Sequence, residues 1–182
     1  MIHVSEVKTD VPAEFRSELQ RKVYETLTGL SIPFERVDNE PAVTMEDCLA
    51  INERLHVNTS KTLFLCNRQQ TQFYLFVTRG DKPFRTKDFG AALGISRVSF
   101  APESFLDPML GTEVGATTVF STLLERSAAV HVVIDEDVLA EEYYGGTDGT
   151  TTGYLRFPAK DLTEKFLPLP RICPYVLLHF RT

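Results

Sequence analysis

The chain has 182 residues, a formal net charge of −6 and a sequence pI near 5.3. This length suits one ordinary domain with a sizeable core, so we expect a single domain over residues 1–182. Hydrophobic residues make up 43% and charged residues 24%, which is typical of a soluble globular protein. No stretch approaches the ~18 apolar residues that a membrane helix needs. The acidic balance also counts against a general nucleic-acid binder, because such proteins neutralise phosphates with a basic surface.

The cysteines and histidines carry no pattern of a metal or disulfide site. Cys48, Cys66 and Cys173 are odd in number, widely separated and set among apolar neighbours, which favours reduced core residues. The four histidines have no metal-ligand spacing. We therefore expect no metal and no other cofactor. The amino terminus lacks a basic segment followed by an apolar one, so we expect a cytoplasmic protein.

The first helix is predicted over residues 12–28, because apolar side chains recur there every four positions and Gly29 follows the last turn. Asp10 is its expected N-cap. Residues 32–38 are predicted to form an edge strand, since Pro33 removes a backbone donor. Thr44 is predicted to cap a second helix, one face of which carries Cys48, Ile51 and Leu55.

Residues 61–67 and 72–78 are two β-rich runs joined by a polar break, which predicts a β-hairpin. Lys61 therefore stands at the mouth of a buried strand. By composition alone, a lysine in that place is most simply a solvated strand end.

Short helices and strands alternate in the remaining sequence. Helices are expected over residues 86–93, 103–110 and 158–167, and Gly94 and Gly111 end the first two. Strands are expected over residues 97–100, 130–134 and 152–157. Residues 172–180 are expected to form a final strand or a packed flap, and Pro174 confines this segment to a sheet edge. This order, without repeat or linker, predicts a mixed α/β (α+β) fold in one domain.

Two loops, at residues 111–118 and 145–153, are rich in glycine and hydroxyl groups, and glycine lets backbone N–H groups approach a ligand closely. From their residues alone, both loops are most simply sets of turns. Neither fits a phosphate-binding loop, and no Gly-x-Ser-x-Gly nucleophile motif occurs. The acidic residues at 135–137 and 141–142 are predicted to be a solvated connection rather than a paired-carboxylate site.

The run Ser60-Lys61-Thr62-Leu63-Phe64-Leu65-Cys66-Asn67 resembles the lysine motif of the YbaK and prolyl-tRNA-synthetase-associated editing domains. Further similarity lies at residues 32–38, 44–47, 80–84, 94–101 and 110–118, and extends from about residue 17 to 167. The resemblance implies a central mixed, barrel-like β-sheet flanked by helices. It also implies a pocket that hydrolyses mischarged aminoacyl-tRNA.

In that family the lysine lies in the pocket, so the resemblance makes Lys61 the expected catalytic residue. It gives the following residues as substrate-binding: Thr44, Thr62, Gly115, Ala116, Thr117, Gly149 and Thr150. An aminoacyl ester is already labile and needs mainly positioning and oxyanion stabilisation, which a cation, backbone N–H groups and hydroxyls can supply. Among relatives, the chain is most similar to freestanding prolyl-tRNA editing proteins that clear alanine from proline tRNA.

Mischarged tRNA, in particular tRNA(Pro), is therefore the expected partner, and prolyl-tRNA synthetase is a second partner that the resemblance suggests. A local basic excess could hold the acceptor stem beside the pocket, through Arg79, Lys82, Arg85 and Lys87. An ordinary solvated loop explains these charges equally well.

Three departures from the family pattern leave the amino-acid preference open. Thr62 stands where asparagine commonly follows the lysine, Asn39 where many members have histidine, and Gly145 with Gly146 where some have His-Pro. Removal of cysteine or serine from tRNA therefore remains an alternative. So do a non-catalytic tRNA- or protein-binding module of the same fold, and the binding of a small carboxylated metabolite by Lys61.

Overall fold

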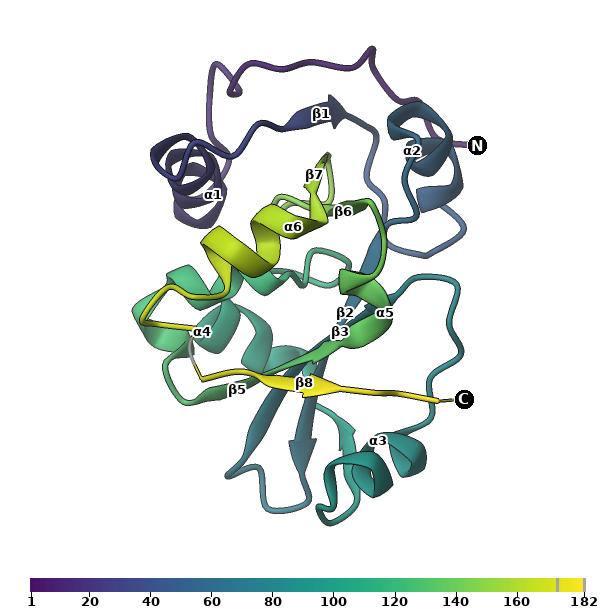
Figure 1. Ribbon diagram of the computed structural model, residues 1–182, viewed down its shortest axis with the longest axis vertical. Coiled ribbons are helices and arrows are strands. Elements are labelled where there is room, and N and C mark those ends of the chain that lie inside the picture. Colours follow the sequence, from purple (N-terminus) through teal and green to yellow (C-terminus); the bar gives the residue numbers. More distant parts are fainter. Residues whose placement is uncertain (173, 182) are drawn as a thin grey trace.

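The computed structural model describes residues 1–172 and 174–181, and it shows a mixed α/β fold with two sheets (Figure 1). The smaller sheet is antiparallel, with the order β1-β7-β6. Its strands are β1 (Glu35–Asp38), β6 (Tyr143–Thr147) and β7 (Gly153–Pro158). In the described part of the chain, no helix is long and apolar enough to cross a membrane.

The larger sheet has five strands in the order β4-β2-β3-β5-β8. Its strands are β2 (Ser60–Asn67), β3 (Phe73–Arg79), β4 (Val98–Phe100), β5 (Val130–Asp135) and β8 (Val176–Leu178). β2 pairs antiparallel with β3 and β4, while β3–β5 and β5–β8 are parallel. The mixed sheet is thus confirmed, but the barrel-like closure is wrong. The edge strands β4 and β8 have three residues each and do not pair with one another.

Short helices surround the sheets. The α-helices are α1 (Glu18–Gly29), α2 (Cys48–Leu55), α3 (Thr86–Leu93), α4 (Leu106–Leu110), α5 (Glu136–Leu139) and α6 (Ala159–Asp161). Further turns are η1 (Glu103–Phe105), η2 (Val119–Leu123), η3 (Glu125–Ser127) and the π-helical η4 (Leu162–Phe166). In Figure 1, α1 and α2 lie on either side of the three-stranded sheet, and α3 lies at the far end of the larger one.

The predicted hairpin is confirmed, and its register sets up the site. Lys61 pairs with Thr78 across β2 and β3, and Val77 pairs with Ile134 across β3 and β5. The next rung therefore brings Lys61, Thr78 and Asp135 into one row at the strand ends. Directly paired residues point to the same face of a sheet, so these three polar side chains share one face.

Both faces of the larger sheet are buried. The face shared with Lys61 carries Leu65 and Phe76, which pack with Phe89 of α3 and with Phe180. The opposite face contributes Val77 to a larger core that also contains side chains of α1, β7 and η4. Burial on both faces explains why the β2, β3 and β5 sequences read as nearly continuous apolar runs.

The first helix begins six residues later than predicted. α1 starts at Glu18, and the Ser17 side chain caps it by accepting from the Gln20 N–H at 3.0 Å. Asp10 instead accepts from the Arg36 guanidinium at 3.2 Å. The preceding segment is extended because it bridges the outer edge of β1 at two points, Val4↔Asn39 and Lys8↔Arg36. β1 is otherwise an edge strand, as predicted.

The other predicted elements are found with shifted ends, except at one loop. The second helix begins at Cys48, with Asp47 and not Thr44 at the N-cap position. α3 and β5 lie where the sequence predicts them, and Gly94 and Gly111 end their helices in the left-handed conformation. Gly145 and Gly146, predicted to be loop residues, lie inside strand β6. A side chain at Gly145 would meet Val57 at 2.7 Å, so glycine is required there by packing and not by a turn.

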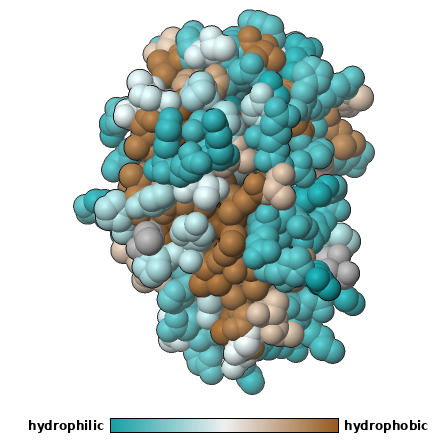
Figure 2. Space-filling model, viewed as in Figure 1, coloured by the Kyte–Doolittle hydropathy of each residue, from teal (hydrophilic) through white to brown (hydrophobic). Residues whose placement is uncertain are grey.

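β8 is the predicted edge strand at the carboxyl-terminal end of the chain. It leaves Val176 and Leu177 46% and 47% exposed. Figure 2 shows an apolar strip down the middle of this face, where Figure 1 places β8. Cys173 lies outside the described residues, whereas Cys48 and Cys66 are buried free thiols, as predicted.

Candidate functional site

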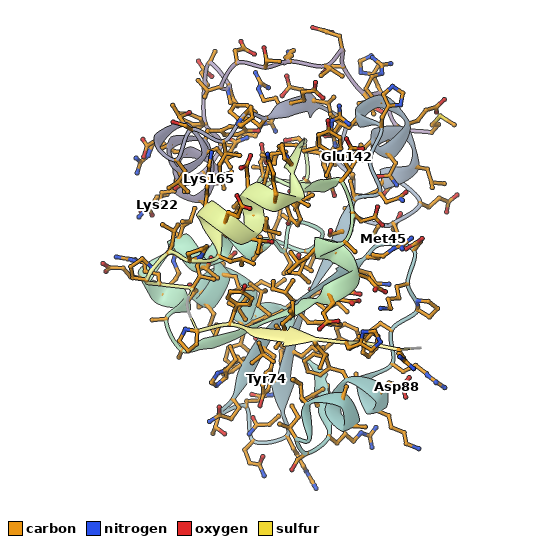
Figure 3. The ribbon with its side chains drawn as sticks, in the orientation of Figure 1. Lys22, Met45, Tyr74, Asp88, Glu142 and Lys165 are labelled. Atoms are coloured by element: carbon orange, nitrogen blue, oxygen red, sulfur yellow. The ribbon has the colours of Figure 1, made fainter. Side chains whose placement is uncertain are left out.

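A cavity of about 250 Å³ lies where β2 begins, bounded by the segment before α2, the loop of residues 112–118 and the small sheet. Five of the residues predicted for the site line it: Thr44, Lys61, Thr62, Gly115 and Thr117. Met45 also lines it, and Figure 3 places Met45 where α2, the start of β2 and the loop after β3 meet. Three segments far apart in sequence therefore converge on Lys61.

Gly149 and Thr150 do not line this cavity. The Thr150 hydroxyl and N–H both donate to the buried carboxylate of Asp148, and Gly149 packs against Leu19 of α1. Gly149 and Thr150 are therefore part of a buried turn and not of the cavity wall. Thr147, two residues before Gly149, does line the cavity. The segment predicted as a loop over residues 145–153 therefore contributes to the site through the end of strand β6.

Lys61 is half-buried, and its ammonium group donates a hydrogen bond to the backbone carbonyl of Lys82. Burial lowers the pKa of Lys61 below its usual value, and the carboxylate of Asp81 opposes this shift. The ammonium is thus partly desolvated, in a site where electrostatic interactions with a ligand are stronger than in water.

Replacement of Asp81 by asparagine is expected to lower the pKa of Lys61 further. Asp81 is the negative charge that raises this pKa, and its loss also frees the positive charge of Arg79, with which it pairs at 2.8 Å. An NMR titration of the Lys61 side chain measures the change. Asp88→Asn is the matched control, because Asp88 pairs with Arg85 and does not affect Lys61. An unchanged or raised pKa in Asp81→Asn contradicts this electrostatic account.

The segment carrying Thr44 is fixed by a reciprocal pair of side-chain bonds. The Thr44 Oγ1 accepts from the Asp47 N–H at 3.2 Å, and the Asp47 carboxylate accepts from the Val43 and Thr44 N–H groups at 3.0 Å each. These bonds lower the pKa of Asp47. This is the capping-box arrangement, closed one turn before α2 begins at Cys48. Thr44 therefore shapes the cavity wall.

The loop opposite Lys61 requires glycine at one position. Gly115 has φ +88°, and a Cβ there would lie 2.9 Å from the Val43 Cα. Ala116 is fully buried, and its N–H donates to the Glu113 carbonyl at 3.1 Å. Within the described residues, the N–H groups of Gly115 and Thr117 donate to no protein acceptor. They are therefore free to donate to a ligand.

Gly115→Ala is expected to lower the free energy of unfolding by about 1–2 kcal/mol through left-handed backbone strain alone, and the contact with Val43 adds to this. Gly29→Ala is the control, because Gly29 ends α1 with nothing within 4 Å of an added Cβ. That change is expected to be neutral or slightly stabilising. Urea denaturation of both variants measures the difference. Equal stability of the two contradicts the assigned role of Gly115.

Cys48 and Tyr154 form part of the cavity wall that the sequence did not predict as functional. Cys48 Sγ lies 3.5 Å from the Tyr154 hydroxyl. Burial raises the pKa of both groups, so both are neutral near pH 7, and the thiol is not an activated nucleophile. In the sequence, Cys48 is marked only as part of the apolar helix face that it shares with Ile51 and Leu55.

The four predicted tRNA-binding cations do not form a free basic surface. Arg79 pairs with Asp81 and Glu141, and Arg85 pairs with Asp88. Lys82 turns inward to Asp135 and Asp137, so it is not presented to phosphates. In the described part of the chain, Lys87 is the one of the four without an ion-pair partner.

The acidic cluster at residues 135–137 is only in part the solvated connection that the sequence predicts, because Glu136 is exposed and the Asp137 side chain is 46% exposed, whereas Asp135 is buried. Asp135 is fully buried and accepts from Thr78 Oγ1 at 2.6 Å and from Lys82 Nζ at 2.9 Å. Local sequence does not reveal this burial, because Thr78 and Lys82 are both more than fifty residues away from Asp135. The Asp137 N–H, which donates to Asp135 Oδ1 at 3.1 Å, is the local partner. The described residues contain no group of three or more potential metal ligands, of the kind a metal site would need.

Four other hollows are larger than this cavity, and the two with the greatest volumes, about 780 and 730 Å³, lie elsewhere on the molecule. The first is lined by the amino-terminal segment, α1 and β1, and the second by the end of α1 and β7. Neither contains Lys61 or the 112–118 loop. We place the site in the smaller cavity, because the desolvated cation and the unpaired backbone donors meet there.

Lys61, with its half-buried cation, and Gly115 and Thr117, whose backbone N–H groups have no acceptor among the described residues, line one small cavity. Such a set of groups suits the binding of a polarised carbonyl or phosphate group. The sequence profile of the aminoacyl-tRNA editing domain matches residues 39–164, which is more than half of the chain. The chain therefore belongs to the aminoacyl-tRNA editing domain family. All of the cavity-lining residues fall within this matched region.

Curated relatives support the same family. The prolyl-tRNA editing protein ProX of Acetoanaerobium sticklandii is 28% identical over 122 residues, which are 67% of this chain and 74% of that protein. The prolyl-tRNA synthetase associated domain-containing protein 1 of Mus musculus is 26% identical over 125 residues, 68% of this chain and 73% of that one.

Solved structures show the same fold. A candidate trans-editing enzyme for prolyl tRNA synthetase superposes with a TM-score of 0.63 at 17% identity, covering 90% of this chain and 98% of that one. A hypothetical protein superposes with a TM-score of 0.66 at 20% identity, covering 86% and 96%. The predicted relationship to the prolyl-tRNA-synthetase-associated editing domains is therefore confirmed in both sequence and fold.

Proposed function

We propose that this protein is an aminoacyl-tRNA deacylase, which hydrolyses the ester bond between a small amino acid and a mischarged tRNA. The observation that carries the proposal is the convergence of Lys61, Gly115 and Thr117 on one cavity. Family membership supports it, because the family is that of the aminoacyl-tRNA editing domains.

Each part of the cavity has a role in ester hydrolysis. The Lys61 ammonium holds the terminal phosphate or the carbonyl region of the substrate. The N–H groups of Gly115 and Thr117 face the ester and stabilise the negative charge that develops on its carbonyl oxygen. Water attacks the carbonyl carbon, assisted by the ribose hydroxyl or the amino group of the substrate. Cys48 and Tyr154 are neutral and form the wall, so no covalent enzyme intermediate is required.

Alanine on tRNA(Pro) is the substrate that we propose. A synthetase pocket built for proline rejects smaller side chains weakly, since each missing methylene is worth only about 1–3 kcal/mol. A second, smaller pocket corrects this error by admitting alanine and excluding proline. The volume of about 250 Å³ supports a small substrate group. The similarity to a protein named as a prolyl-tRNA editing protein supports tRNA(Pro).

The test is the release of amino acid from four charged tRNAs: alanyl-tRNA(Pro) and, alongside it, prolyl-, cysteinyl- and seryl-tRNA. We expect alanyl-tRNA(Pro) to be hydrolysed fastest and prolyl-tRNA(Pro) to survive. Preferential loss of cysteine or serine assigns a different amino acid to the same reaction. Binding of tRNA without loss of any amino acid overturns the deacylase proposal in favour of a binding module.

A further inference from the structure

The backbone of Lys82 contacts the Lys61 ammonium, and the Lys82 side chain is held inside the protein. Its Nζ lies 2.9 Å from Asp135 Oδ2 and 2.8 Å from Asp137 Oδ2. The Lys82 side chain is 11% exposed and that of Asp135 only 1%. Thr78 Oγ1 donates to the same Asp135 oxygen at 2.6 Å. A buried ion pair with a further hydrogen bond has little freedom to move, because breaking it leaves a buried charge without a partner.

The backbone of Lys82 is the part that meets Lys61. Its carbonyl oxygen accepts the hydrogen bond from the Lys61 ammonium. The Lys82 N–H donates to the Arg79 carbonyl at 3.2 Å and closes the turn after β3. Pro83 follows, and a proline restricts the backbone of the residue before it. The direction of the Lys82 carbonyl is therefore fixed by the turn before it, by Pro83 after it and by the ion pairs of the Lys82 side chain.

The sheet register explains why these groups come together. Lys61, Thr78 and Asp135 form one row across β2, β3 and β5, with their side chains on the same face. Lys82 emerges from the turn at the end of the row, so its side chain reaches Asp135 while its carbonyl reaches Lys61. Lys82 does not line the cavity and has no direct access to a substrate there.

We propose that Lys82 is a positioning residue for Lys61: its ion pairs with Asp135 and Asp137 fix the Lys82 carbonyl, and that carbonyl holds the Lys61 ammonium in place at the cavity. The effect on catalysis rests on the proposed deacylase function. The effect on the Lys61 ammonium does not, and it is measured separately.

The first experiment measures how fast an amine-acetylating reagent modifies Lys61, by mass spectrometry of the folded protein. In Lys82→Met the carbonyl loses its anchor, and we expect Lys61 to react several-fold faster than in the wild type. Asp137→Asn removes only the outer carboxylate, which is 46% exposed, and leaves the Asp135 pair intact, so we expect this variant to keep its fold. We expect an intermediate rate. Lys82→Arg keeps the cation and is expected to restore slow modification.

Arg85→Gln is the matched control, because it breaks an ion pair of the same segment on the exposed surface, where the Arg85 side chain is 75% exposed. We expect its Lys61 to react like that of the wild type. Equal Lys61 reactivity in Asp137→Asn, Lys82→Met and the wild type overturns the proposal, whatever the protein does to tRNA.

The second experiment separates kcat from KM for alanine release. A 1 Å misplacement of a catalytic group can lower the rate by about 10²-fold, so we expect Lys82→Met to lower kcat by about 10-fold or more at unchanged KM, with rescue by arginine. A raised KM with unchanged kcat instead means that Lys82 contacts tRNA, and overturns the positioning role. If the wild type hydrolyses no aminoacyl-tRNA, the proposed function fails, and the acetylation rates still decide the role of Lys82.

Discussion

Replacement of Lys61 by alanine is expected to lower kcat for alanine release from alanyl-tRNA(Pro) by about 10²–10³-fold, the loss typical of removing one group that stabilises transition-state charge. The ammonium is half-buried, and burial already lowers its pKa, so part of its hydration has been replaced by the site. Its attraction to a developing negative charge is therefore stronger than that of a surface lysine.

Lys61→Arg and Lys160→Ala complete this experiment. Arginine keeps the charge but not the compact shape of the ammonium, so we expect partial activity. Lys160 is exposed and lies on α6, outside the cavity, and its loss is expected to leave the rate unchanged. If Lys61→Ala retains wild-type kcat and KM while its melting temperature is unchanged, Lys61 has no part in the reaction.

Asp148→Ala is expected to lower the free energy of unfolding by about 3 kcal/mol or more, because each buried donor left without a partner costs about 1–3 kcal/mol. The Asp148 carboxylate is 1% exposed and accepts from Gln20 Nε2 at 2.9 Å, from the Tyr24 hydroxyl at 2.8 Å and from the Thr150 hydroxyl at 2.7 Å. It thus links α1 to the turn between β6 and β7. Burial, aided by Asp148, raises the pKa of Tyr24, which keeps that hydroxyl a donor.

Thermal unfolding measures this prediction. At about 2–4 °C per kcal/mol for a chain of this size, a loss of 3 kcal/mol corresponds to about 6–12 °C. Asp107→Ala is the control, because that side chain is 86% exposed, and its change is expected to stay within about 1 kcal/mol. A melting temperature for Asp148→Ala within 2 °C of the control, a window set by the same ~2–4 °C per kcal/mol scaling, would show that the buried network adds little.

The local part of this fold could be predicted from the sequence. The hairpin was predicted from two apolar runs and a polar break, and α3 from its periodicity and the glycine that ends it. Thr44, Lys61 and Gly115 were placed in one site by resemblance to the editing domains, and the structure brings them to one cavity. These signals are short-range, or they follow from the order of elements along the chain.

The errors have long-range causes. The inward turn of Lys82 depends on Asp135, which is 53 residues away, and no local pattern marks that pair. The N-cap of α1 is Ser17 and not the expected Asp10. The segment before Ser17 bridges β1, and the Asp10 carboxylate accepts a hydrogen bond from Arg36. Gly149 and Thr150 are predicted from the sequence to bind a ligand. In the structure, the Thr150 N–H and hydroxyl donate to the buried Asp148 carboxylate, and both residues are part of a buried turn.

The central claim is that the aminoacyl end of the substrate binds in the cavity of Lys61. The most direct measurement uses an adenosine carrying alanine through a 3′-amide, which cannot be hydrolysed as an ester, and follows the backbone NMR signals during titration. The account predicts saturable shifts centred on Lys61, Gly115 and Thr117, which are lost in Lys61→Ala. Shifts centred instead on the hollow of about 780 Å³ beside α1 and β1, or the same shifts in Lys61→Ala, would contradict it.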